Sequence, residues 1–358
     1  MPRWLGLALD PTPGGSTLDV LADPGPIDIP DPTTWIPIEN AQPNKGFTDS
    51  DTNNLGYGTR GASAPLPFRA RPTFTFQTDL FSKAAKLLVA AGLGKVGTPT
   101  GTAPAPIKTP VSPADSGGQL PGLIAWLVRD GQTDRLSGLW VDSFTVTVQG
   151  AVPTLQVTMS ALYQETVETP GSLPTASYVG YGVDQKYSGV MFKVLQGASN
   201  AEVAVDCVAN FAFTYNNNLE DDEDVIYCRG ENVLTELVGG RYRRRQWPGR
   251  HALGEQSLTG TIGFGTTRQD IEERQLFATA ERVVAEFHEN PLGTTPPSDR
   301  LLRIVIPQQV ITGGDGADAY SRTAPIKSSY EWGGFIDPTT GADVVAEFVD
   351  TAALTIAA

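Results

Sequence analysis

The stretch Leu139-Trp-Val-Asp-Ser-Phe-Thr-Val-Thr-Val148, followed after a short break by Thr154-Leu-Gln-Val-Thr-Met-Ser160, indicates the fold class of this chain. Polar and apolar residues alternate in both segments, which is typical of β-strands with one buried face. Residues 204–219 and 257–264 repeat the pattern in the other half of the chain. This internal echo favours two related β-domains over one domain with a tail.

We therefore expect a mainly β protein with a few helices, built from two related antiparallel β-sandwich domains that are each flanked by an α-helix. The first domain is expected at residues 73–168 and the second at 189–358. Residues 169–188 contain several prolines and glycines and are interpreted as the linker. Residues 1–72 are rich in Pro and Gly and are expected to form an extended arm with loops that wraps a neighbouring subunit, with a disordered tail as the alternative.

Two segments have the apolar spacing of helices. Residues 81–93 predict a short helix that ends at the glycines Gly92 and Gly94. Residues 269–289 predict a second helix, which Pro291 would end. The Pro-, Gly- and Thr-rich residues 97–122 are expected to form a loop.

Composition excludes several function classes. The 358 residues carry 26 basic and 40 acidic side chains, so the net charge of −14 argues against a protein that coats nucleic acid. The chain has no apolar window long enough for a transmembrane helix, and its first residues do not resemble a signal peptide, so we expect cytosolic synthesis.

Cys207 and Cys228 form no metal-binding pattern, and histidines are too few for metal or triad chemistry. Motifs for phosphate loops, nucleophile elbows and zinc proteases are absent. We therefore expect no enzyme activity and no cofactor.

Two charged runs lie close together between residues 216 and 256. The acidic run is interpreted as a solvated loop tip, or as a surface that faces a channel or another subunit. The basic run is interpreted as a partner for the acidic run of a neighbouring copy, as a solvated loop, or as a contact for nucleic acid. The members of the two runs are Glu220, Asp221, Asp222, Glu223 and Asp224, and Arg241, Arg243, Arg244, Arg245 and Arg250.

Several segments, in this order along the chain, are similar to the tail tube (major tail) proteins of long-tailed, siphovirus-like bacteriophages. These are Arg3-Trp-Leu-Gly-Leu-Ala-Leu-Asp10, Leu87 to Gly94, Gly138 to Val148, Phe213-Thr-Tyr-Asn-Asn-Asn-Leu-Glu220, Gly239-Gly-Arg241 and Ser257-Leu-Thr-Gly260. The long N-terminal region departs from the shorter members of that family.

The resemblance implies a structural virion protein that polymerises into stacked rings and forms a conduit for DNA. Strands of each domain would join an intersubunit β-barrel, and a duplicated chain would form a trimeric, pseudo-hexameric ring. The implied partners are other copies of the chain, the tape measure, tail terminator and distal tail proteins, and DNA in transit. The implied location is the virion tail, after assembly in the host cytoplasm.

Geometry is consistent with such a conduit. Four strands from each half of three chains, about 4.8 Å apart and tilted about 40°, give a perimeter of roughly 150 Å and an opening of about 35–40 Å inside the side chains. One chain closing its own strands would give a diameter of only about 16 Å, which side chains would fill. The polar sides of the strands predict the lumen-facing residues, although any β-sandwich also has a polar outer face. These candidates are Ser143, Thr145, Thr147, Gln156, Thr158 and Ser160.

The alternative function is a two-domain β-sandwich binding module for carbohydrate or cell-surface adhesion, which would cluster exposed aromatic residues on one face.

Overall fold

A computed structural model describes residues 3–10, 32–44, 47–48, 68–70, 72–103, 105–115, 118–129, 132–149, 152–161, 163–167, 186–196, 201–205, 208–221, 233–238, 241–246, 251–264, 276–278, 280, 282–289, 300–314, 328–339 and 341–354. The first half contains β1 (Arg3–Leu9), β2 (Thr34–Asn44), β3 (Phe47–Thr48), β4 (Phe68–Ala70), β5 (Thr73–Asp79), α2 (Ser82–Leu93), β6 (Gly94–Val96), β7 (Ile107–Pro113), β8 (Leu123–Arg129), β9 (Gln132–Val148), β10 (Thr154–Ser160) and β11 (Tyr163–Val167). The second half contains β12 (Gly189–Gln196), β13 (Ala201–Val205), β14 (Val208–Asn216), β15 (Glu220–Asp221), β16 (Val233–Val238), β17 (Arg241–Gln246), β18 (His251–Ala252), β19 (Ser257–Phe264), β20 (Val283–His288), β21 (Leu301–Ile306), β22 (Gln309–Gly313), β23 (Ser328–Gly334) and β24 (Val345–Asp350).

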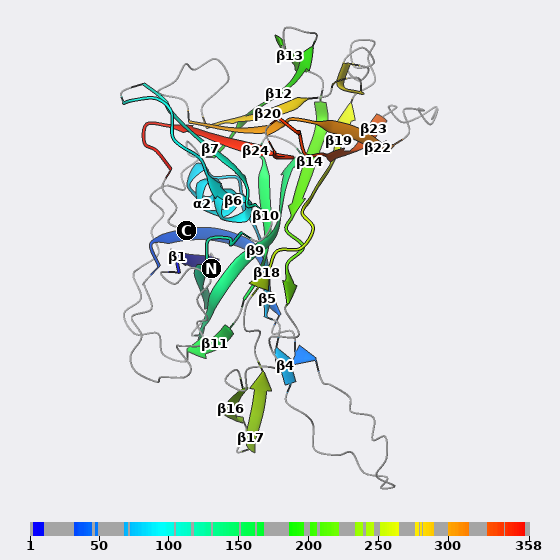
Figure 1. Cartoon of the computed structure of the whole chain (residues 1–358). Helices are drawn as coiled ribbons and strands as arrows, with labels where there is room; N and C mark the ends of the chain where they lie inside the picture. The colour runs from blue at the N-terminus through cyan, green and yellow to red at the C-terminus, as the bar shows by residue number, and fades with distance from the viewer. Residues whose placement is uncertain are drawn as a thin grey trace, which may run out of the picture.

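The predicted fold class is confirmed, because the described chain is mainly antiparallel β-sheet with packed layers (Figure 1). Two long strands connect two of these layers. The first part of β2 pairs with β1, and its last residues pair with β5. The first part of β9 pairs with β8 and β11, and its second part pairs with β10 and β14. Because both strands cross between layers, β1 and β8 form one side of a sandwich whose other side contains β5 and β10.

The second of these layers is a continuous antiparallel run in the order β2-β5-β10-β9-β14-β19-β23-β22. We call it the eight-strand run. Its two halves have the same topology. In each half, two strands that a long excursion separates in the chain lie side by side in the sheet. The second strand of a later hairpin lies next to them. The first half is β2, β5 and the hairpin β9–β10, and the second is β14, β19 and the hairpin β22–β23.

This repeat has a different alignment from the sequence echo. The echo matched the segment of β9 and β10 with the segments of β14 and β19. In the sheet, β14 and β19 instead occupy the places that β2 and β5 occupy in the first half. The echo was misaligned because any two Thr-rich strands with one buried face have the same alternation, whatever their place in the sheet.

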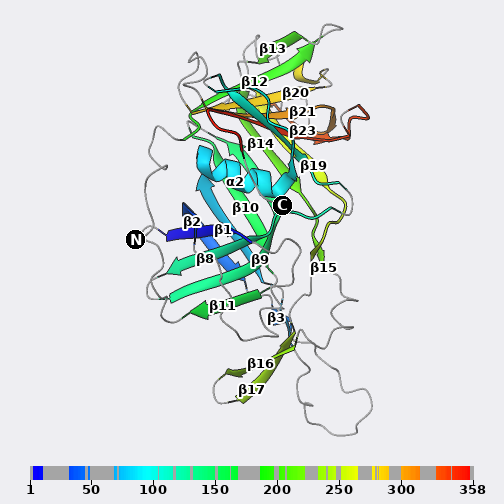
Figure 2. The ribbon, with the colours of Figure 1, turned by 60° about the vertical axis from the view of Figure 1, so that its left-hand side comes forward.

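A second sheet has the order β13-β12-β20-β21-β24-β7-β6 and combines strands from both halves of the chain. Helix α2 contacts β9, and it also contacts β6, β7 and β24. Figure 2 shows α2 across the middle of the molecule, below β20 and β21 of the second sheet and above β8 and β9. It is helical because Ala84, Ala85, Leu88 and Val89 form one buried stripe, and it ends at Gly94, whose φ is 92°. The predicted helix at 81–93 therefore has the expected position.

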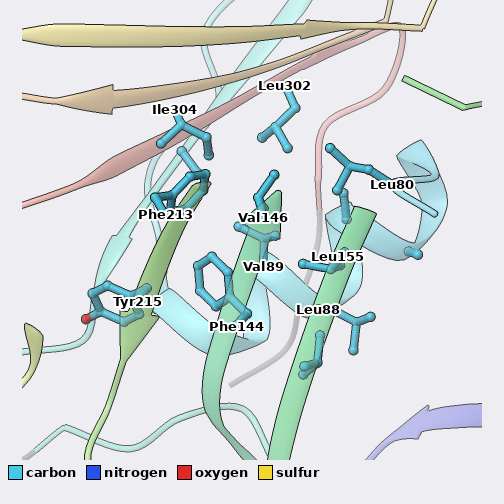
Figure 3. Packing of buried hydrophobic residues seen from close by; sticks show 14 of the residues in the cluster. Leu80, Leu88, Val89, Phe144, Val146, Leu155, Phe213, Tyr215, Leu302 and Ile304 are labelled. Atoms are coloured by element: carbon cyan, nitrogen blue, oxygen red, sulfur yellow. The ribbon is translucent and has the colours of Figure 1, made fainter. Parts of the chain in front are cut away.

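The main hydrophobic core is shared by the two halves. Figure 3 shows Phe144, Val146 and Phe213 of the eight-strand run lying between α2 and the second sheet, close to Leu302 and Ile304. All of these side chains are at most 1 % exposed. Since one core unites residues from both halves, neither half buries its apolar surface alone. The predicted linker lies mostly outside the described residues, so the domain boundary at 169–188 stays a prediction.

Three expectations about secondary structure are wrong. Residues 3–9 and 34–44 are not part of an arm, because β1 and β2 are strands of the sandwich whose Leu5 and Ile36 are fully buried. Residues 283–288 form strand β20 instead of the end of a helix. Residues 107–113 form strand β7 inside the predicted loop. The remaining residues of 1–72 lie largely outside the described part.

Candidate functional site

The candidate site is the polar face of the eight-strand run. In β9, Ser143, Thr145 and Thr147 lie on this face, and Phe144 and Val146 point into the core. Because side chains alternate along a strand, each of these residues is placed by its buried neighbours. The β10 residues Gln156 and Thr158 lie on the same face, since the register sets Gln156 opposite Thr145 and Thr158 opposite Ser143.

The polar face continues over the neighbouring strands. Thr145 and Thr214 of β14 are opposite one another, and their hydroxyl oxygens are 2.9 Å apart. On the other side, the hydroxyls of Thr158 and Thr75 of β5 are 3.2 Å apart. One cross-strand row runs through Glu39, Gln77, Gln156, Thr145, Thr214, Thr259, Gly333 and Val310. The centre of this row carries hydroxyl and amide groups, and its one carboxylate, that of Glu39, lies at the edge.

The sixth candidate, Ser160, is placed differently from the other five. The ladder between β10 and β9 shifts register between Thr158 and Met159, so that Ser160 lies opposite Trp140. Its side chain is only 3 % exposed. The extra residue on β9 is Asp142, whose carboxylate accepts a hydrogen bond from the Leu219 N–H at 2.9 Å. A bulge of this kind interrupts the alternation, and strict parity therefore ends there.

A buried amide holds the end of the polar strands to α2. The Asn217 side chain is fully buried and donates to the carbonyl oxygens of Gly92, at 2.8 Å, and Val141, at 2.9 Å. Its own oxygen accepts from Gln256 Nε2 at 3.3 Å. This amide fixes the junction between β14, β9 and the helix. In the sequence, the signal for this contact is the unusual run of three amides, Asn216 to Asn218.

The apolar side of the run is filled by a tryptophan in the second half. Trp332 of β23 lies opposite Gly260 of β19, and a Cβ at Gly260 would approach the indole within 2.1 Å. Trp332 also stacks on Phe211 with ring centroids 5.8 Å apart. The described tryptophans Trp4, Trp35, Trp126, Trp140 and Trp332 are all buried, so they do not form the exposed aromatic cluster that the binding-module alternative requires.

The two long excursions of the chain meet away from the body. One excursion separates β2 from β5 and contains β3 and β4, and the other separates β14 from β19 and contains β15 to β18. They meet where β17 pairs in parallel with β4, and the four strands β16, β17, β4 and β3 form a small sheet at the bottom of Figure 1. The connections between β2 and β5 and between β14 and β19, which correspond in the repeat, therefore meet in the same small sheet.

The charged runs lie on this second excursion. Glu220 and Asp221 form β15, which pairs with His251 and Ala252 of β18. Arg241, Arg243, Arg244 and Arg245 lie in β17, where the register places Arg243 opposite Glu236 of β16. Asp222, Glu223, Asp224 and Arg250 are outside the described residues, as are both cysteines. The main chain thus places the basic run in the small sheet and the described start of the acidic run in β15.

A separate group of ion pairs crosses the second sheet. Arg303 of β21 bonds to Glu347 at 3.1 Å and to Glu202, and Lys193 is 2.7 Å from Glu286. Burial raises the pKa of Glu286, but hydrogen bonds with His288 and Lys193, and the charges of Lys193 and Arg303, outweigh it and lower this pKa to about 2. All of these partners lie in strands of the second sheet, so the ion pairs connect the strands of that sheet to one another.

Among the described residues, no three His, Cys, Asp or Glu side chains come together in a way that fits a metal ion. Within the same residues, no helix has the length and apolar character needed to cross a membrane.

Residues 44–334 match the model of the phage tail tube protein family. This chain belongs to the phage tail tube protein family. The match runs from the last residue of β2 to the last residue of β23, so it covers nearly all of the eight-strand run. No curated protein sequence matches the chain. As a tail tube protein it is a structural component of the bacteriophage virion, located in the tail, and the resemblance noted from the sequence is confirmed at the level of the family.

Proposed function

We propose that three copies of the chain close into a ring in which their eight-strand runs form one barrel, and that stacked rings form the tube through which DNA leaves the virion. The observation that carries this proposal is the repeat within the eight-strand run, together with its polar face. A duplicated half-sheet supports pseudo-hexameric symmetry, since three chains supply six equivalent half-sheets.

The size of the barrel supports the trimer. Three runs of eight strands give 24 strands, and this number leads to an opening of about 35–40 Å at the usual strand spacing and tilt. Two copies would give an opening of only about 19–24 Å by the same arithmetic, which leaves almost no room for the hydration shell of duplex DNA, about 20 Å wide. In this arrangement Ser143, Thr145, Thr147, Gln156 and Thr158 line the lumen.

The chemistry of the polar face suits a passage. A surface of arginines and lysines would bind the DNA backbone and slow it, because each neutralised phosphate releases counterions and adds affinity. Hydroxyl and amide groups offer no such charge. The Glu39 carboxylate at the edge of the row adds repulsion, and the net charge of −14 for the whole chain acts in the same direction.

We further propose that the small sheet of β3, β4, β16 and β17 contacts the next ring in the stack. Residues 233–246 contain one Glu and four Arg, so this hairpin carries a net charge of +3 on a chain whose net charge is −14. A basic projection suits an acidic neighbouring copy, including its run Glu220 to Asp224. Specific partners at the tube ends would be the tail terminator and distal tail proteins, with the tape measure protein inside, in a siphovirus-like tail that is assembled in the host cytoplasm. The role is structural and requires no catalysis.

The test is cryo-electron microscopy of the purified protein over a range of concentrations. We expect rings or tubes with three chains per ring and a channel of about 35–40 Å. Rings of six chains would contradict the duplicated-ring arrangement. Particles that remain monomeric at every concentration, also in the presence of pre-formed tube ends, would contradict the tube-forming function.

A further inference from the structure

In the part of the chain that the structure describes, the eight-strand run ends at β22, and no strand pairs with the outer edge of β22. This strand pairs with β23 and is the last strand of the described run. Its residues, Gln309-Val-Ile-Thr-Gly313, include no charge and no proline. Natural sheets usually protect a free edge with such residues, because unpaired main-chain N–H and C=O groups otherwise recruit another strand. An edge without protection is therefore expected to have a partner.

The same edge carries the exposed apolar side chains of the described residues. Val310, Phe335 and Ile336 are 46 %, 48 % and 68 % exposed, and they are the large hydrophobic residues with substantial exposure in the part that the structure describes. Val310 lies opposite Gly333, and the Phe335 ring comes within 3.6 Å of the place where a Gly333 side chain would begin. Val310 and Phe335 thus form an apolar border at one end of the polar row. Their gathering at one edge marks a contact surface.

The repeat identifies what lies against this edge. Within the chain, the two halves of the run join where β9 pairs with β14 in an antiparallel ladder from Ser143–Asn216 to Val148–Phe211. In the repeat, β22 takes the place of β9, and the last part of β2 takes the place of β14. Within the described residues, a strand that corresponds to β9 therefore lies at one edge of the run, and the strand that corresponds to its partner lies at the opposite edge.

We propose that β22 of one copy pairs antiparallel with residues 39–44 of a second copy, and that Val310, Phe335 and Ile336 are buried in this junction. The junction repeats between chains the β9–β14 ladder that exists within each chain. Pro43 has no N–H, so the ladder is expected to rely mainly on the other residues of this segment. The inference rests on the proposed ring and names the surface that closes it.

Two substitutions at the edge and one matched control test the proposal. Val310→Arg and Phe335→Asp place a charge in the junction, and Thr259→Arg places the same arginine on the same row of the run, two strands away from the edge. Val310, Phe335 and Thr259 are all exposed, so the three variants are expected to fold with circular dichroism spectra and melting temperatures like those of the wild type. We expect at least a tenfold loss of sedimentable rings or tubes for the two edge variants, and wild-type amounts for Thr259→Arg.

Hydrogen–deuterium exchange of the wild-type chain provides a second measurement that does not depend on variants. On assembly, amides in peptides that cover residues 309–313 and 39–44 are expected to exchange at least tenfold more slowly. Rings that form while 309–313 stays unprotected, or that Val310→Arg forms as well as the wild type does, overturn the junction and leave the proposed tube intact. A wild-type chain that never forms rings overturns both.

Discussion

The side-chain amide of Asn217 donates a hydrogen bond of 2.8 Å to the carbonyl oxygen of Gly92, which lies 125 residues earlier in the chain. Gly92 is in the last turn of α2, where carbonyl groups have no partner within the helix. A second donation to Val141 brings β9 into the same contact. One side chain therefore connects the helix of the first half, the central strand and the end of β14.

Replacing Asn217 with Ala is expected to lower the free energy of unfolding by about 2–4 kcal/mol, because two buried carbonyl groups lose their donor. The measurement is urea denaturation of the unassembled chain. Gln156→Ala, which removes an amide from the exposed face, is the control and should change stability by less than about 0.5 kcal/mol. Equal effects at the two positions would contradict the role given to Asn217.

Gly92→Ala is expected to destabilise the protein by about 1–3 kcal/mol, although alanine is the better helix former. A Cβ at this position would lie 2.8 Å from the Phe144 ring and 3.1 Å from Val141. Thermal unfolding gives the comparison. In a Phe144→Leu background, which removes the ring, Gly92→Ala should lower the stability by less than it does in the wild type. If the effects of the two substitutions are additive, the contact with Phe144 is not the cause.

Stability between pH 2 and pH 4.5 is expected to depend on Glu286. Because the pKa of this group falls from 4.5 to about 2 on folding, its contribution is complete above pH 4.5 and disappears as the pH drops to about 2. The loss amounts to as much as about 3 kcal/mol. Glu286→Gln should flatten the stability profile in this window, whereas Glu255→Gln, at an exposed site, should leave it unchanged. Unfolding curves at a series of pH values provide the test.

Lys86 is expected to be replaceable. Burial, and then the charge of Arg300, lower its pKa to about 8 despite the opposite effect of Glu289. The ion-pair partner of Lys86 is Asp350. Without the lysine, the Asp350 carboxylate would still have Arg300 Nε at 3.3 Å and a hydrogen bond from the Thr351 N–H at 2.6 Å. Lys86→Met is therefore expected to change stability at pH 7 by between zero and about +1 kcal/mol.

The pH dependence of Lys86 has a definite sign. The unfolded chain holds the proton more tightly than the folded one, so wild-type stability rises relative to Lys86→Met as the pH increases from about 8 to 10.5. Denaturation of the wild type and of Lys86→Met between about pH 8 and pH 10.5 measures this difference in the free energy of unfolding. A constant difference would show that Lys86 is not perturbed, and Lys83→Met provides the comparison at an exposed position of the same helix.

Local alternation predicted the polar face but not its limits. Ser143 to Thr147 alternate with buried Phe144 and Val146, so their common face follows from the period of a strand. The position of Ser160 does not follow, because the bulge at Asp142 arises from the register with a distant strand. The residues of β20 are nearly all buried on both faces, and a strand of this kind has no period that separates it from a buried helix.

Long-range pairing explains the other differences. β7 contains Pro110 and Pro113 and looks like a loop, yet β24 and β6 pair with it from the two sides. The N-terminal residues Trp4 and Leu5 are more apolar than is typical of a solvated tail, and in the structure both are buried in β1. The true alignment of the repeat appears only in the order of strands, which no local pattern contains.

The β9–β14 ladder also bears on how a tube would grow. Because both strands belong to one chain, every second seam of the proposed ring is formed during folding and cannot dissociate. Closure then requires three seams between chains, where a ring of unduplicated subunits would need six. Such a ring nucleates at a lower protein concentration, and its remaining seams are the points at which mutation, proteolysis or an inhibitor would interrupt tail growth.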